Sequence, residues 1–155
     1  MEDLKLEPFA VDDLPAAIAS LVSGASAAKL MAARGMAPLR PADLVVAVYQ
    51  LSFDADDRVK HAAEAGPANL PDKVVLGPLG EPLPPAVLHF FAEHLPATRR
   101  KAFETILLNH ATADETFVLL ARRLDEGGLE IIFFAETVRG VHTPTLRGEF
   151  LPRIA

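Results

Sequence analysis

The chain has 155 residues, of which 50% are hydrophobic and only 6% aromatic, and it contains no cysteine and no tryptophan. The lack of cysteine excludes disulfides, thiolate metal sites, iron–sulfur clusters and cysteine nucleophiles. The net charge of −6 arises in residues 1–95, which hold 7 Lys and Arg against 13 Asp and Glu. This acidity argues against binding to nucleic-acid phosphates, where cations dominate the affinity.

The first half of the chain has the pattern of short helices. Asp12 or Asp13 is placed to cap a helix that runs to Val22, with Pro15 tolerable in its first turn. Further helices are expected over 27–34, through the apolar stripe Leu44, Val48 and Leu51, from 56 to 65 with Val59, Ala62 and Ala63 inward, and from Pro71 onward. The Pro- and Gly-rich segment 77–85 is expected to be an irregular insertion.

The second half continues in the same way. Helices are expected over residues 85–95, 98–108, 114–124, 129–139 and 143–150. Their apolar stripes are Leu88, Phe91 and Leu95, then Phe103, Ile106 and Leu107, then Phe117, Leu120 and Leu124. We therefore expect roughly nine or ten helices and no sheet of three or more strands.

Helix ends recur at a regular spacing. The chain places Gly or Asn after four apolar stretches, at Gly35, Gly66, Asn109 and Gly140, which are 31, 43 and 31 residues apart. Both residue types tolerate the left-handed conformation that closes many helices. A new helix start follows each one, marked by Pro41, Pro71, Asp114 and Pro144, with Thr112 and Thr143 as possible caps. A recurrence of about 30 residues predicts stacked helical hairpins.

The segment 101–124, KAFETILLNHATADETFVLLARRL, carries a family resemblance. It resembles the leucine-rich-repeat-variant and HEAT-like helical repeats, whose pattern is roughly V-A-x-N-P-x-T-P-x-x-x-L-x-x-L-A. The matching residues are Asn109, Thr112, Phe117, Leu120 and Ala121, and the departures are His110 and Ala113, where the repeat carries Pro. The resemblance implies a right-handed superhelix of antiparallel helices with a concave surface that binds another macromolecule. Some of these relatives carry a Cys-ligated cluster, which this chain cannot.

The expected fold class is therefore all-α, an α-solenoid of short antiparallel helix pairs with about four repeats, formed by residues 1–155 as a single domain. The acidic N-terminus lacks the pattern of a signal peptide, and no apolar run approaches the roughly 20 residues of a membrane span. We expect a soluble, cytoplasmic protein.

Two patterns suggest chemistry. His89 and Glu93 share a helix face, whereas His89 and His94 are five residues apart and cannot converge on one metal. We interpret His89 and Glu93 as a surface pair, with a metal or acid–base role as the alternative. The segment 54–58, DADDR, lacks the Gly and the Glu that a calcium loop needs at its sixth and twelfth positions, so Asp56 is expected to cap a helix instead.

Two further segments suggest binding. Pro78, Pro82, Pro84 and Pro85 favour a rigid connector, with a polyproline ligand as the alternative. The basic residues at 99–101 and 122–123 are expected to be surface charge. If both clusters faced the same way, they would hold an acidic partner segment or a phosphate. A nucleic-acid reader would need one continuous face from Arg99, Arg100, Arg122, Arg123 and Arg147.

Taken together, the sequence favours a non-enzymatic protein–protein interaction or scaffold module, with no catalytic, cofactor-binding or metal-binding residues. Its partner is expected to be another protein or a second copy of the chain. The C-terminal segment combines apolar and basic residues, as interaction surfaces do. The predicted partner-binding residues are Arg147, Phe150, Leu151, Arg153 and Ile154.

Overall fold

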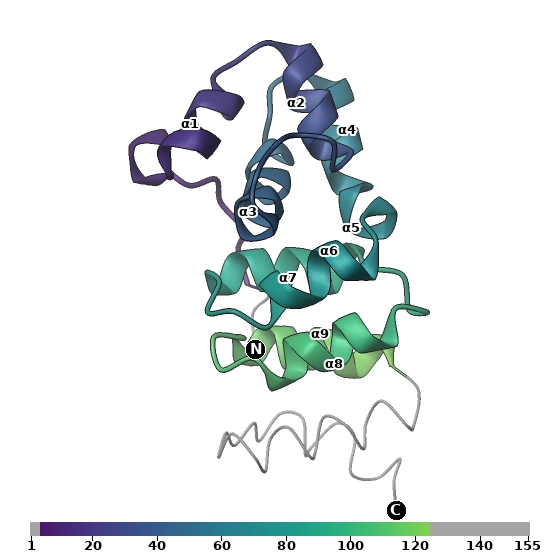
Figure 1. The fold of residues 1–155 in the computed structure, drawn as a ribbon. Helices are drawn as coiled ribbons and strands as arrows, with labels where there is room; N and C mark the ends of the chain where they lie inside the picture. Colours follow the sequence, from purple (N-terminus) through teal and green to yellow (C-terminus); the bar gives the residue numbers. More distant parts are fainter. Residues whose placement is uncertain (1–3, 125–155) are drawn as a thin grey trace, which may run out of the picture. The chain divides into compact units, whose positions relative to one another are not determined.

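The computed structural model describes residues 4–124 of the chain (Figure 1). All regular structure in this range is helical, with nine α-helices, one 3-10 helix and no strand between residues 4 and 124. This confirms the all-α class. The described residues divide into two compact units, one of residues 6–78 and one of residues 79–124 together with residues 4 and 5. That residues 1–155 form a single domain stays a prediction.

The first unit holds the 3-10 helix η1 and the α-helices up to α6. Their bounds are η1 Val11–Asp13, α1 Ala16–Val22, α2 Ser26–Ala33, α3 Pro41–Leu51, α4 Asp57–Glu64, α5 Gly66–Asn69 and α6 Asp72–Leu79, whose last residue opens the second unit. Helix α3 packs against α1, α2 and α4, and α2 also packs against α4. The predicted stripe of α3 is buried, with Leu44, Val48 and Leu51 at most 4% exposed.

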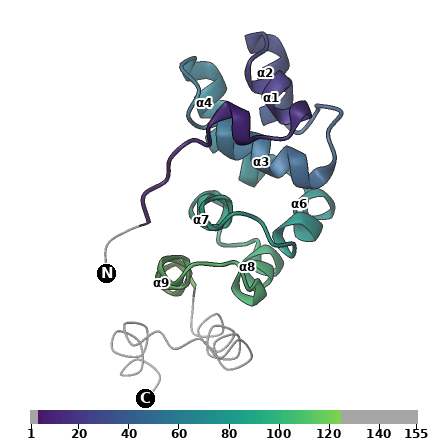
Figure 2. The same cartoon turned by 90° about the vertical axis from the view of Figure 1, so that its left-hand side faces the viewer.

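The second unit holds α7 Pro85–His94, α8 Arg100–Leu108 and α9 Asp114–Arg123. Helix α7 packs against both α8 and α9, and Figure 2 views α7 and α9 nearly along their axes. The predicted stripes form the core of this unit, because Leu88, Leu95, Phe103 and Leu120 are all fully buried. Apolar side chains at helical spacing therefore identified the inward face of each of these helices.

Two of the predicted glycine caps differ from one another. Gly35 has a φ of 79° and follows Arg34, the C-cap residue of α2, as expected for a left-handed helix end. Gly66 does not have a positive φ, since Gly35 is the only residue in 4–124 that does, and it begins the short helix α5. A Cβ at Gly66 would lie 2.8 Å from Val48 Cγ1 and 3.2 Å from the Ala33 carbonyl oxygen. Close packing, and not backbone conformation, explains this glycine.

The predicted polar caps at two helix starts are wrong. Asp12 and Asp13 lie in η1, and α1 begins at Ala16 after Pro15 without a side-chain cap. Ala113 occupies the N-cap position of α9, while the Thr112 hydroxyl donates a hydrogen bond to the carbonyl oxygen of Ile106. Asp12 and Asp13 thus belong to the turn before α1. The Thr112 side chain binds a carbonyl in the last turn of α8 and does not cap α9.

The segment 77–85 is more regular than predicted. Helix α6 continues through Gly77 and Pro78 to Leu79, and α7 begins at Pro85. The helix continues because Val75 and Leu79, one turn apart, are both fully buried and bury one apolar face. Only residues 80–84 remain irregular, so the alternative of a continuous polyproline ligand is also wrong.

Asn109 ends α8 as predicted, but with φ −76° and ψ 124° its backbone is extended and not left-handed. Its buried side-chain amide donates to the carbonyl oxygens of Leu79 and Glu81, both at 2.6 Å, and accepts from the Ala111 amide at 2.9 Å. Asn109 therefore fixes the connector before α7 to the end of α8. The predicted helices 129–139 and 143–150 and the cap Gly140 lie outside the described residues.

Candidate functional site

Helix α3 binds an extended stretch of the chain's own backbone. Residues 6–10 form no regular structure, and two adjacent side chains at the end of α3 hold them. The Gln50 amide makes both hydrogen bonds to one residue: the Phe9 amide donates to Gln50 Oε1 and Gln50 Nε2 donates to the Phe9 carbonyl, each at 2.9 Å. The Tyr49 hydroxyl donates to the Glu7 carbonyl oxygen at 2.6 Å. We call residues 6–10 the strap, and Tyr49, Gln50 and Phe53 the strap-binding face.

An aromatic cluster supports these polar contacts. The Phe9 ring lies 5.2 Å from the Tyr49 ring, centroid to centroid, and the Phe53 ring lies 5.3 Å from the Tyr49 ring in an edge-on arrangement. Tyr49 is fully buried. Burial of the phenol raises the pKa of Tyr49 above its usual 10.0. The hydrogen bond with the Glu7 backbone lowers this pKa by less, and the negative charge of Glu7 adds a smaller rise. The phenol is therefore neutral at physiological pH and available as a hydrogen-bond donor.

The strap-binding face was not predicted from the sequence. Tyr49 and Gln50 belong to a helix whose other residues show an ordinary apolar stripe, and no motif joins them to Phe9, which is 41 residues from Gln50. The available signal was weak: a buried face that includes one Tyr next to a Gln, both of which require hydrogen-bond partners.

The predicted surface pair of His89 and Glu93 is wrong for His89. His89 is only 7% exposed, and its Nδ1 lies 2.8 Å from the Thr116 hydroxyl of α9. Glu93 is exposed. The histidine thus forms part of the contact between α7 and α9. Among the described residues, no group of three or more His, Cys, Asp or Glu side chains is placed to hold a metal ion.

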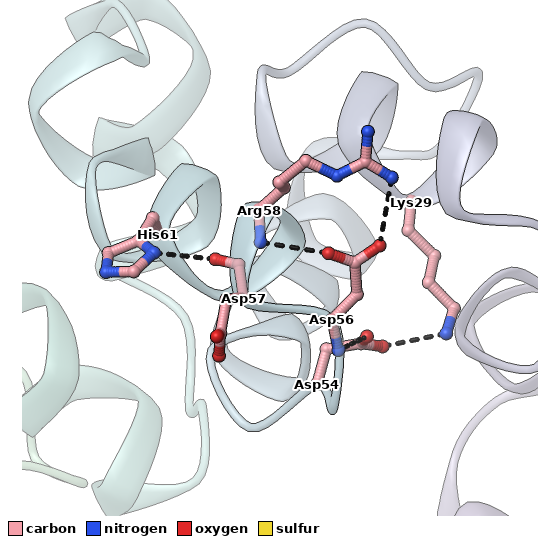
Figure 3. Close-up of polar contacts among 6 residues, drawn as sticks. All are labelled: Lys29, Asp54, Asp56, Asp57, Arg58 and His61. Carbon is pink, nitrogen blue, oxygen red and sulfur yellow. Dashed lines mark hydrogen bonds and ion pairs between the residues drawn. The ribbon is translucent and has the colours of Figure 1, made fainter.

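The acidic segment before α4 organises a loop, as Figure 3 shows. Asp56 caps α4, as predicted, by accepting a hydrogen bond from the Arg58 amide at 2.9 Å. The Arg58 guanidinium also contacts this carboxylate, and these bonds lower the pKa of Asp56. Asp54 accepts from the Asp56 amide at 2.9 Å and forms a largely buried ion pair with Lys29 of α2 at 2.7 Å. These carboxylates bind groups of the protein itself.

One residue of the two basic clusters, Arg123, makes contacts within the fold. The Arg123 guanidinium donates to the carbonyl oxygens of Ala92 and Glu93, which end α7, and lies 5.3 Å above the Phe103 ring. This arginine satisfies helix-end carbonyls and packs on the core. The described contacts therefore give Arg123 a structural role, contrary to the expectation of surface charge. Arg100 and Arg122 are exposed.

The predicted partner-binding residues Arg147, Phe150, Leu151, Arg153 and Ile154 lie outside the described residues. In the range 4–124, the large apolar side chains that are exposed are Val11, Met31, Met36 and Leu108. Met31 and Met36 are close together, because the Met36 amide donates to the Met31 carbonyl at the end of α2.

Comparison with known proteins adds no relative: no protein-family model, no curated protein and no solved structure matches this chain. Within residues 4–124, no helix has the length and apolar character needed to cross a membrane.

Proposed function

We propose that this chain is a non-enzymatic protein–protein interaction module of the helical-repeat type, built as an α-solenoid and acting in the cytoplasm. The observation that carries the proposal is the order in which helices pack. Each unit pairs a helix with the next but one along the chain: α1 with α3, α2 with α4, and α7 with α9. Stacked helical hairpins produce this order, because equivalent helices of successive hairpins lie side by side.

The polar chemistry of the described residues supports a binding role over catalysis. The carboxylates Asp54 and Asp56, the buried His89 and the guanidinium of Arg123 all contact other groups of the protein. Each has a structural task at a helix end or between helices. The resemblance of 101–124 to leucine-rich-repeat-variant and HEAT-like repeats adds to this proposal, since such arrays serve mainly to bind other macromolecules.

The proposed partner surface includes Arg147, Phe150, Leu151, Arg153 and Ile154, on the basis of sequence. The test is the double variant Phe150→Ser/Leu151→Ser, compared with the wild type in self-association, by light scattering, and in capture of proteins from the native host. We expect the variant to lose self-association or capture while its circular dichroism spectrum stays unchanged.

The matched control is Met36→Ser/Leu108→Ser, which removes two exposed apolar side chains elsewhere and should keep the interaction. An unfolded Phe150→Ser/Leu151→Ser variant would assign these residues to the core and the interface to another surface. A wild-type chain that neither self-associates nor captures any protein would contradict the proposed function itself.

A further inference from the structure

The hydrogen bonds between the strap and α3 recognise backbone, and not side chains. The hydrogen bonds that the Tyr49 and Gln50 side chains make with the strap involve main-chain atoms of Glu7 and Phe9. A side-chain amide that pairs with both the N–H and the C=O of one residue substitutes for a neighbouring strand. Any extended peptide presents the same pair of groups, so this part of the recognition is independent of sequence.

Sequence preference comes from one aromatic position. The ring of Phe9 contacts the buried Tyr49, and Leu6 is half-buried, whereas Glu7, Pro8 and Ala10 are exposed. Pro8 has no amide hydrogen, and both carbonyls that are bound belong to its neighbours. The strap-binding face therefore fits an extended segment with an aromatic residue, a bound carbonyl two residues before it, and little restriction in between.

We propose that the strap-binding face of α3 is a binding site for an extended peptide segment of another protein, with an aromatic side chain at the Phe9 position, and that the strap occupies it in cis. This inference rests on the proposed function, because it takes the partner to be a protein. The strap-binding face, however, shares no residue with the proposed partner surface at Arg147, Phe150, Leu151, Arg153 and Ile154. The strap acts as an internal competitor, and the partner binds when the strap is displaced.

Tethering determines how strong the competition is. The strap is joined to α3 through residues 11–40, which include α1 and α2 packed on α3, so its effective concentration at the site is on the order of 1 mM. A free peptide with the same sequence therefore displaces the wild-type strap poorly. Weakening the strap, without touching the face that binds it, should expose the site to a peptide supplied in trans.

The experiment uses the full chain and a fluorescein-labelled synthetic peptide of residues 4–12, LKLEPFAVD, followed by fluorescence anisotropy. The variant Phe9→Ala removes the ring from the strap and leaves Tyr49 and Gln50 in place. We expect the Phe9→Ala chain to bind this peptide at least about tenfold more tightly than the wild type does. Because Tyr49 is the only tyrosine of the chain and the peptide has none, its emission should change over the same titration.

Two matched controls test the contacts. A peptide with Ala in place of Phe should bind the Phe9→Ala chain about tenfold more weakly or worse, since it lacks the ring. The chain variant Phe9→Ala/Gln50→Leu should lose binding of the unaltered peptide, since it lacks the paired amide. If Phe9→Ala does not fold, Phe9→Leu, which keeps an apolar side chain, takes its place with the same expected order.

Folded variants that show no saturable binding, or equal binding of the two peptides, would overturn the proposal. A strap that instead exchanges between two copies would give a concentration-dependent dimer without peptide binding, which also overturns it. The Phe150→Ser/Leu151→Ser chain carries an intact strap and strap-binding face, so adding Phe9→Ala to it should give the same peptide affinity as Phe9→Ala alone. The peptide titration therefore tests the strap-binding face of α3, and the Phe150→Ser/Leu151→Ser experiment tests the proposed function separately.

Discussion

In residues 6–78 helix α2 ends by a backbone arrangement, whereas in residues 79–124 helices α7 and α8 end against polar side chains. At the end of α2, the left-handed Gly35 lets its own amide donate to Ala32 and the Met36 amide donate to Met31. This is the arrangement of a Schellman motif, which satisfies the last carbonyls of a helix locally. It needs a small residue with a positive φ and no distant partner.

The ends of α7 and α8 are instead joined by side-chain hydrogen bonds to distant parts of the chain. Arg123 of α9 donates to the last carbonyls of α7, and Asn109 binds backbone groups 28 to 30 residues earlier in the chain. These contacts close a helix end and join two elements at the same time. The difference predicts that residues 6–78 respond mainly to changes in side-chain size, and residues 79–124 mainly to the loss of hydrogen bonds.

The largest effect is expected at Asn109. The variant Asn109→Ala leaves the Leu79 carbonyl without this partner in a buried setting, and the Glu81 carbonyl and the Ala111 amide without it in a part-buried one. Each unmade buried bond costs about 1 to 3 kcal/mol, so we expect a loss of about 3 kcal/mol or more in urea unfolding. Asn109→Gly should lose as much, because the backbone at this position is not left-handed.

Asn69→Ala is the control for that result, because Asn69 also ends a short helix but is exposed. It should change the free energy of unfolding by no more than about 0.5 kcal/mol. If Asn109→Gly were as stable as the wild type, the asparagine would act through backbone conformation, and the contrast between the two regions would not hold.

A smaller loss is expected at Gly66. Its missing Cβ leaves room for Val48 and for the Ala33 carbonyl, so Gly66→Val should destabilise the chain by about 2 kcal/mol through overpacking. The control Gly77→Ala lies in helix α6, where the new Cβ meets nothing within 4 Å beyond its chain neighbours and the nearby backbone of its own helix, and it should stabilise by about 0.5 to 1 kcal/mol. Equal melting temperatures for Gly66→Val and the wild type would show that this packing is loose.

The helices were predictable because each buries an apolar stripe that repeats with the helical period. Residues such as Val48, Phe91 and Ile106 are buried where the spacing predicts, and the starts of α3, α7 and α9 lie at the predicted residues. Burial of one helix face is a local property of the sequence, since it follows from the order of apolar and polar residues alone.

The polar contacts were less predictable because their partners are distant in the sequence. Thr112 and Asn109 were placed at helix ends from their residue type, yet the atoms they bind depend on where other turns pass in space. The same holds for Gln50 and Phe9, which meet across 41 positions. Residue type predicts that such groups need hydrogen bonds, and the fold decides which ones.

The smallest expected effect concerns pH. Tyrosine absorbance reports on residues 6–78 alone, because Tyr49 is the only tyrosine of the chain. Its pKa is raised mainly by burial, so the phenolate absorbance of the folded chain should reach its midpoint above pH 10.0. Above pH 10.0 the unfolded chain loses this proton first and binds fewer protons than the folded chain. Tyr49 therefore contributes its full stability below pH 10.0, and that contribution is lost as the pH rises through the folded pKa.

The urea-unfolded chain is the reference for this titration, and its midpoint should lie at the ordinary value of 10.0. Phe9→Ala removes the ring that lies 5.2 Å from Tyr49, so water should reach the phenol and the midpoint should move down toward the unfolded value. Asn109→Ala, studied where the chain is still folded, should leave the midpoint unchanged, because the hydrogen bonds of the Asn109 side chain are made with residues 79–111. A folded wild-type chain that titrates at 10.0 would mean that Tyr49 is solvated and that the strap does not cover it.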